Sequence, residues 1–285
     1  AWTTTPWTLP SNLALAINSG LPYYAIYKDG YLYFATQSYI LSNKDFLQKE
    51  GFKVEFTKKE AEPVLKVSGI DSIESKSLLG LKYKPLFPYF ANDKRGGEKA
   101  FTIIEGDFVS DEDGTGVVHI APGFGEDDQM LAKANGIPTL CPVDEGGKFT
   151  NEIFDIKFPD SAQTLSLKGR NVLGYDENRQ HIKENDVNDD VIKYLKSTAA
   201  WIKTEQYLHN YPHCWRTDTP LIYKAVPSWY VEVTKIRDRM VELNQDIHWT
   251  PEHVKDGLFG KWLENARDWS ISRNRFWGTP IPVWK

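Results

Sequence analysis

Residues 23–35 read Tyr23-Tyr24-Ala25-Ile26-Tyr27-Lys28-Asp29-Gly30-Tyr31-Leu32-Tyr33-Phe34-Ala35, and they say more about the fold class than any other stretch. Two aromatic and β-branched runs flank an Asp-Gly pair, which is the strongest short-range signal for a β-hairpin. Further strands are expected at residues 52–56, 64–67, 101–105, 117–120 and 137–143. Helices are fewer, at residues 38–50 and 126–134. This α+β, β-rich pattern predicts a closed or nearly closed β-barrel rather than a doubly wound sheet.

The composition changes near residue 160, and helices are expected beyond it. One helix is capped by Asn188-Asp189-Asp190, a second covers residues 228–243, and a third opens at Thr250-Pro251. We therefore expect a β-barrel core at 1–160, a peripheral helical extension at 161–210 and a helical return segment at 211–285. The chain begins inside an ordered motif and stops after a strand-like run at 280–284, so we expect a fragment of a longer protein.

Charge and cysteine content exclude several classes of protein. A net charge of -5 over 285 residues argues against wrapping nucleic acid by charge alone, although a local basic patch remains possible. The only two cysteines, Cys141 and Cys214, form neither a disulfide framework nor a zinc knuckle, which indicates a reducing, cytoplasmic compartment. No apolar run approaches the roughly 18 residues of a membrane helix, so no membrane partner is expected.

Hydroxyl groups are concentrated in Trp2-Thr3-Thr4-Thr5-Pro6-Trp7-Thr8-Leu9-Pro10. Threonines beside prolines predict a stiff, extended ribbon that offers hydroxyls and backbone amides to a small ligand. Strand alternation would send Thr3 and Thr5 one way and Thr4 the other. A threonine nucleophile is conceivable, but no histidine and aspartate partners stand at a diagnostic spacing.

A second polar motif covers residues 114–128, where a short apolar strand ends in a glycine-rich turn. His119 lies on the strand, and Glu126-Asp127-Asp128 follow the turn. Together these features predict a pocket that positions a substrate and a water, hence hydrolysis. Taken alone, His119 is more often structural. Asp128 is equally consistent with helix-dipole compensation, worth about 0.3–1 kcal/mol, and with a carboxylate that holds an ammonium group.

These two motifs and three others resemble the editing domain of the isoleucyl-tRNA synthetase family. The matching stretches follow in the family's order along essentially the whole chain, at residues 2–12, 114–128, 142–149, 213–216 and 269–278. The valyl and leucyl families carry Arg-Pro after their threonines, so Thr5-Pro6-Trp7-Thr8 favours the isoleucyl branch. Cys-Trp-Arg-Thr at 214–217 resembles the eukaryotic cytosolic form. Both ATP-handling signatures of the family are missing, so amino-acid activation is not expected.

The resemblance implies a six-stranded barrel with peripheral helices that hydrolyses valyl-tRNA(Ile), with valyl-adenylate as a second substrate, while excluding isoleucine. Its partners would be the acceptor end of tRNA(Ile) and the rest of the synthetase chain. Water would attack the ester without a covalent intermediate, metal or cofactor. By the same resemblance, Asp128 would hold the α-ammonium group, and His119 and Thr8 would form walls of the side-chain pocket. Thr3, Thr4 and Thr5 would orient the ester and the terminal adenosine. Trp7 would pack behind them, and Asn12 would make a polar contact.

An alternative is a tRNA-docking fragment without independent hydrolysis. Arg267, Arg273 and Arg275 could then contact phosphates, although packing and ion pairs explain them better in isolation.

Overall fold

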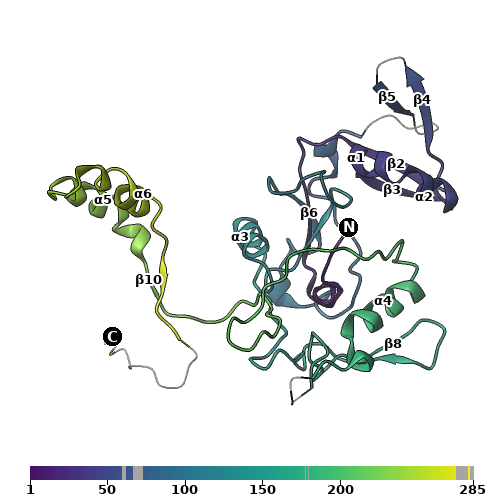
Figure 1. Cartoon of the computed structure of the whole chain (residues 1–285). Coiled ribbons are helices and arrows are strands. Elements are labelled where there is room, and N and C mark those ends of the chain that lie inside the picture. Colours follow the sequence, from purple (N-terminus) through teal and green to yellow (C-terminus); the bar gives the residue numbers. More distant parts are fainter. Residues whose placement is uncertain (60–61, 67–72, 177, 179, 274–281, 283–285) are drawn as a thin grey trace. The chain divides into compact units, whose positions relative to one another are not determined.

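The computed structural model describes residues 1–59, 62–66, 73–176, 178, 180–273 and 282. These residues form two compact units, Ala1–Ala225 and Val226–Lys285 (Figure 1). Among them, no helix has the length and apolar character needed to cross a bilayer.

A three-stranded sheet lies at the centre of the first unit. Strand β1 (Ala14–Ile17) is the middle strand, parallel to β6 (Thr102–Glu105) and antiparallel to β7 (Val118–Ile120). Three of the four β1 residues are buried, because the strand has a neighbour on each side and core side chains around it. The register pairs Leu15 with His119, so the middle strand fixes the position of that histidine.

The expectation of a closed six-stranded barrel is wrong. The other strands of the described residues pair only as two-stranded ribbons, namely β2 (Tyr23–Lys28) with β3 (Tyr31–Thr36), β4 (Glu55–Lys59) with β5 (Glu62–Lys66), β8 (Ile156–Lys157) with β9 (Thr164–Leu165), and β10 (Tyr230–Val231) with β11 (Trp269–Ser270). Residues 137–143, expected as a strand, form only an isolated bridge at Val143. Pro138 and Pro142 each remove a ladder donor there, which prevents regular pairing.

The hairpin predicted from residues 23–35 is confirmed. Asp29 and Gly30 take φ values of 51° and 85°, the left-handed conformation that a tight hairpin turn requires. At its other end, the Tyr23 hydroxyl donates to the Gly116 carbonyl, which ties the hairpin to the turn before β7.

The helices of the first unit are short. Helix α3 (Glu126–Ala134) confirms the prediction, whereas the helix expected at 38–50 is two helices, α1 (Gln37–Ser42) and α2 (Lys44–Lys49), separated at Asn43. Helix α4 (Val187–Ser197) is capped by Asp186, not by the expected Asn188-Asp189-Asp190. Its buried residues recur with helical spacing and pack into the main core, at Val187, Val191, Tyr194 and Leu195. The 3-10 turns are η1 (Pro6–Ser11), η2 (Ser75–Leu78), η3 (Lys94–Gly96) and η4 (Lys183–Asn185).

The second unit packs two helices, α5 (Arg237–Gln245) and α6 (Leu258–Glu264), with the turns η5 (Val233–Lys235) and η6 (Glu252–Val254). The helix expected over 228–243 begins only at Arg237, because residues 230–231 pair as β10. The helix expected from Thr250 begins only at Leu258. Buried Asn244 joins the two parts, since its amide donates to the Lys255 carbonyl and accepts from the Trp249 indole.

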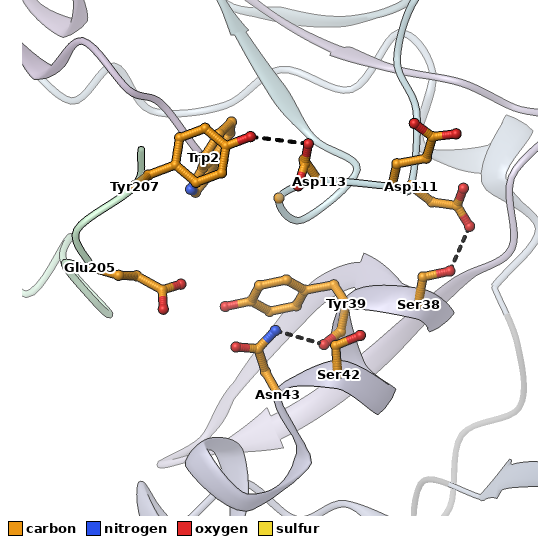
Figure 2. Close-up of a pocket in the computed structure, with 11 residues that line it drawn as sticks. Trp2, Ser38, Tyr39, Ser42, Asn43, Asp111, Asp113, Glu205 and Tyr207 are labelled. Carbon is orange, nitrogen blue, oxygen red and sulfur yellow. Dashed lines mark hydrogen bonds between the residues drawn. The ribbon is translucent and has the colours of Figure 1, made fainter. Parts of the chain in front are cut away.

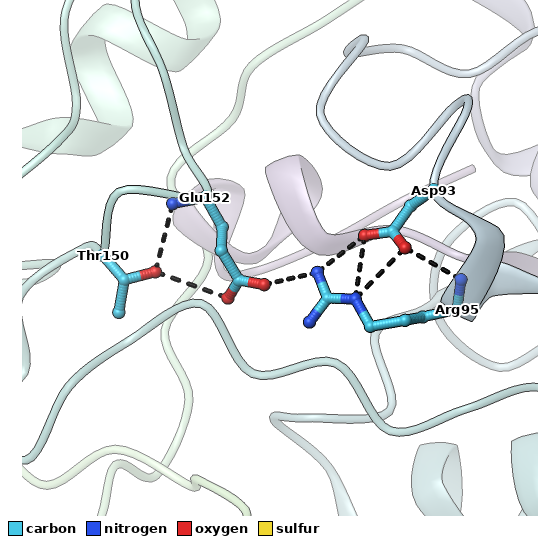
Figure 3. A network of polar contacts seen from close by, with 4 residues as sticks. All are labelled: Asp93, Arg95, Thr150 and Glu152. Atoms are coloured by element: carbon cyan, nitrogen blue, oxygen red, sulfur yellow. Dashed lines mark hydrogen bonds and ion pairs between the residues drawn. The ribbon is translucent and has the colours of Figure 1, made fainter.

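An ion-pair network joins two surface loops of the first unit (Figure 3). The Arg95 guanidinium contacts Asp93 in its own turn and Glu152 in a distant loop. These hydrogen bonds from Arg95 lower the pKa of Asp93. Because the Arg95 side chain is 55% exposed, solvent screens the interaction. We expect Arg95→Ala to change the free energy of unfolding by less than about 1 kcal/mol in urea denaturation. A loss of several kcal/mol would mean that the two loops depend on this link.

Candidate active site

The threonine segment is extended only at its start. Trp2 bridges Val118 in parallel, and from Pro6 the chain turns into the 3-10 helix η1. Proline at the first helical position presets the backbone angle, and the Thr8 amide and hydroxyl both donate to the Thr5 carbonyl, at 3.0 and 2.8 Å. The expectation of an extended ribbon over residues 2–10 is therefore wrong beyond Thr5.

Three of the four expected threonines join His119 in a chain of hydroxyl groups. The contacts are 3.5 Å from Thr3 Oγ1 to Thr5 Oγ1, 3.3 Å from Thr5 Oγ1 to Thr8 Oγ1, and 2.9 Å from Thr8 Oγ1 to His119 Nε2. Thr4 is exposed instead, which confirms the predicted alternation. The turn of η1 thus carries the threonine hydroxyls to strand β7.

The hydrogen bonds of Thr8 define the protonation of His119. The single hydroxyl proton of Thr8 goes to the Thr5 carbonyl, so Thr8 accepts from His119 and the imidazole proton lies on Nε2. Nδ1 remains a buried acceptor without a partner among the described residues. Burial lowers the pKa of His119 to about 4, so the ring is neutral at pH 7. Because burial favours the neutral form, this group's contribution to stability is lost as the pH falls below about 6.5.

The Asp128 side chain reaches the backbone just beyond the end of strand β7. Asp128 belongs to the first turn of α3, and its Oδ2 accepts from the Ala121 amide at 2.8 Å, two residues after His119. Burial raises the pKa of Asp128 to about 6, with the Ala121 hydrogen bond opposing the shift and the charge of Asp127 adding to it. A Cβ at Gly125 would stand 3.0 Å from the Asp128 carboxyl carbon, so glycine permits this approach. The result is a largely desolvated carboxylate suited to a cationic ligand.

Trp7 and Asn12 form hydrogen bonds within the protein, although the Trp7 indole N–H is buried without a partner among the described residues. The Trp7 amide donates to the Asn188 side chain at 3.0 Å, and its buried ring packs edge-on against Phe124 at 4.9 Å. The Asn12 amide donates to the Ala14 carbonyl at 2.8 Å and accepts from the Tyr83 hydroxyl at 2.6 Å. Burial raises the pKa of Tyr83, so it stays protonated as a donor. Sequence reasoning missed Asn188 and Tyr83 as supports of the site.

A pocket of about 220 Å³ adjoins the start of the threonine segment (Figure 2). Its walls combine rings, including Trp2 and Tyr207, with carboxylates such as Asp111 and Asp113. It does not include Thr3, Thr5, Thr8, His119 or Asp128, so the hydroxyl chain and the pocket are separate features. The described residues contain no group of three or more histidine, cysteine, aspartate or glutamate side chains placed to hold a metal ion.

The candidate phosphate contacts lie in the second unit. Arg273 donates to the carbonyl oxygens of Ser270 and Ser272, while Arg275 lies outside the described residues.

Comparison with known proteins defines the class. The family model for class I tRNA synthetases (I, L, M and V) matches residues 7–285, so the chain belongs to this family. Within it, the chain is 55% identical over 285 residues to the isoleucine–tRNA ligase of Rickettsia felis and 54% identical over 288 residues to that of Rickettsia prowazekii. Each match covers 100% of this chain but only 22% of the relative. The family resemblance of the motifs is thus confirmed.

The eukaryotic branch expected from residues 214–217 has no support, because the curated relatives compared are bacterial. Among solved structures, the crystal structure of GlLeuRS-CP1 matches 50% of this chain and 53% of its own, with 16% identity and a TM-score of 0.34. That likeness is too weak to inform the fold.

Proposed function

We propose that this chain hydrolyses the ester of valyl-tRNA(Ile) and spares isoleucyl-tRNA(Ile). The observation that carries the proposal is that two polar features meet at β7. The hydroxyl chain ends there on neutral His119, and the partly desolvated carboxylate of Asp128 reaches the end of the same strand. Family membership and the similarity to isoleucine–tRNA ligases support a substrate of this class. In the reaction, the water oxygen bonds to the ester carbonyl carbon, the bond from that carbon to the ribose oxygen breaks, and the proton that the water loses ends on the ribose oxygen.

Asp128 recognises the substrate by charge in this proposal. A free aminoacyl ester carries an α-ammonium group, and the partly desolvated carboxylate gains a counter-ion when that group binds. An N-blocked ester lacks the charge and is rejected. The same contact would accept valyl-adenylate, which also has a free ammonium group.

His119 and Thr8 select the side chain by size. Both are buried and hydrogen-bonded to each other, so neither can move aside at low cost. One methylene in an apolar pocket changes the discrimination between two substrates by only about 10–200-fold, with isoleucine against valine as the standard example. A second site that accepts valine and excludes isoleucine adds to the discrimination of the amino-acid activation site. The hydroxyls of Thr3 and Thr5 orient the ester, and exposed Thr4 faces the terminal adenosine.

The remaining parts serve the same reaction. We place the catalytic residues in 1–160, with helix α4 of the 161–210 segment supporting them through Asn188 and with 211–285 leading toward the rest of the synthetase chain. The partner is the acceptor end of tRNA(Ile).

The test is deacylation of valyl-tRNA(Ile) and isoleucyl-tRNA(Ile) by the 285-residue chain. We expect the chain to release valine faster than isoleucine, and the mass of the protein to stay unchanged after quenching because water is the nucleophile. A stable acyl adduct on a threonine would instead indicate covalent catalysis. Folded protein that hydrolyses neither ester would contradict the proposal and favour a docking fragment.

A further inference from the structure

Five aromatic rings form a continuous row on the first unit, which we call the aromatic ladder. Consecutive ring centroids are 5.2 Å apart for Trp2 and Tyr207, 5.8 Å for Tyr207 and His209, 6.0 Å for His209 and Tyr211, and 6.2 Å for Tyr211 and His213. The last four alternate along an extended segment without helix or strand, so they share one side of it. Leu208, between two of them, is 99% exposed.

The first end of the ladder is tied to a distant loop and its other end is held by a local turn, although its rings reach solvent. At the first end the Tyr207 hydroxyl donates to Asp113 at 3.1 Å, and Figure 2 shows the Trp2 and Tyr207 rings lying together beside that contact. At the other end His213 donates through Nδ1 to the Asp218 carbonyl at 2.9 Å, and a backbone hydrogen bond joins Cys214 to Thr219. Such a surface loses little conformational entropy on binding.

We propose that the aromatic ladder is the stacking surface for the unpaired 3′ strand of the tRNA acceptor end, an assignment that rests on the proposed function. Tyrosine and histidine rings offer flat faces to nucleobases, and stacking of this kind tolerates any base. The ladder begins next to the threonine segment, because its first ring, Trp2, immediately precedes Thr3 in the chain. A strand whose terminal ester reaches the threonines would therefore leave along these rings.

The length of the ladder fits a short single strand. The six extended residue-to-residue steps from Tyr207 to His213 span roughly 20 Å. Known single-strand sites begin at about 4 nucleotides, which agrees with an unpaired tRNA end rather than with a long RNA.

The charges around the ladder predict how binding responds to salt. Residues 199–225 contain three cations, Lys203, Arg216 and Lys224, against two carboxylates, Glu205 and Asp218. Lys203 pairs with Glu205, and the pocket beside the first two rings adds the carboxylates Asp111, Glu112 and Asp113. Few phosphates can be neutralised here, so few counter-ions are released, and the affinity should depend only weakly on salt. A phosphate-binding groove would show a steep dependence.

The experiment titrates the 285-residue chain into a fluorescent single-stranded RNA of about 7 nucleotides that ends in CCA. We expect His209→Ala and Tyr211→Ala each to weaken binding about tenfold, and Tyr211→Phe to bind like the unchanged chain because it keeps the ring. The matched control is Leu208→Ala, which alters the same segment on its other side and should leave the affinity unchanged. Thermal unfolding of every variant shows that each is folded.

The RNA titration would overturn the ladder assignment in three ways: no loss in either alanine variant, an equal loss in Leu208→Ala, or an affinity that falls steeply with salt. Loss of self-association in the ladder variants, without RNA binding, would assign the surface to a second copy of the chain and overturn it as well. A further readout compares the valyl ester of adenosine alone with valyl-tRNA(Ile). Ladder variants should raise KM only for the tRNA. If no ester is cleaved but RNA binding still needs the ladder, only the proposed function fails.

Discussion

Asp128→Asn is expected to lower kcat/KM for valyl-tRNA(Ile) by about a hundredfold or more while the protein stays folded. Asparagine keeps an oxygen that can accept from the Ala121 amide, so the local backbone retains its partner. It lacks the charge that holds the α-ammonium group, and loss of one member of a desolvated charge pair costs about 2–5 kcal/mol. The measurement is the initial rate of valine release. Asp127→Asn, an exposed neighbour in the same helical turn, is the control and should change little.

The pH dependence of hydrolysis provides an independent check on the role of Asp128. Because the pKa of Asp128 is raised to about 6, hydrolysis should decline as the pH falls through 6 and the carboxylate becomes protonated. The effect on stability has the opposite sense, since burial favours the protonated form. This carboxyl group's contribution to stability falls as the pH rises from about 4 to about 6. Asp128→Asn should therefore be no less stable than the unchanged chain at pH 7. If Asp128→Asn is folded and its rate at pH 7 is unchanged, Asp128 does not hold the α-ammonium group.

His119→Ala is expected to remove most of the discrimination against isoleucine. The neutral, buried ring would form part of the wall that the extra methylene of isoleucine meets, and that methylene is worth about 10–200-fold. Hydrolysis of isoleucyl-tRNA(Ile) should rise toward the valyl rate, measured as the ratio of the two kcat/KM values. The unfolding temperature should fall, because the large-to-small change leaves a cavity and Thr8 loses a donor.

A pair of Thr8 variants separates size from hydrogen bonding. Thr8→Ser keeps the hydroxyl that accepts from His119 and removes one methyl group, so it should admit isoleucine with little loss of stability. Thr8→Val keeps the volume but leaves His119 Nε2 without its partner, at a cost of about 1–3 kcal/mol. Unchanged discrimination in both His119→Ala and Thr8→Ser would exclude these two residues from the size filter.

Local signals predicted the local elements of this fold. The Asp29-Gly30 turn, helix α3 and the strands near residues 102–105 and 118–120 depend on neighbours in sequence, and all are present. The middle strand β1 was not predicted, because Ala14–Ile17 is only four residues long and apolar throughout. Its parallel pairing with residues near 103 is a long-range choice that no local pattern encodes. The barrel prediction failed for the same reason, since a count of short strands does not determine which of them pair.

The candidate site shows the same division. Its motifs singled out Thr8, His119 and Asp128, but only the folded chain joins Thr8 to His119 across 111 residues. Supports such as Asn188 and Tyr83 carry no sequence signal, because amides and tyrosines occur throughout the chain. The aromatic ladder did have a sequence signal, because aromatic residues recur with a period of two at Tyr207, His209, Tyr211 and His213.

The hydrogen bond from the Trp7 amide to Asn188 has a consequence for the order of events during protein synthesis. The two residues are 181 positions apart, so η1 cannot reach its final anchor until helix α4 has been translated. At about 5–20 residues per second, roughly 10–40 s pass between the two. During that interval the nascent chain holds its threonines without the helix that fixes them. The candidate site is therefore completed late, after strands β1, β6 and β7 have emerged from the ribosome.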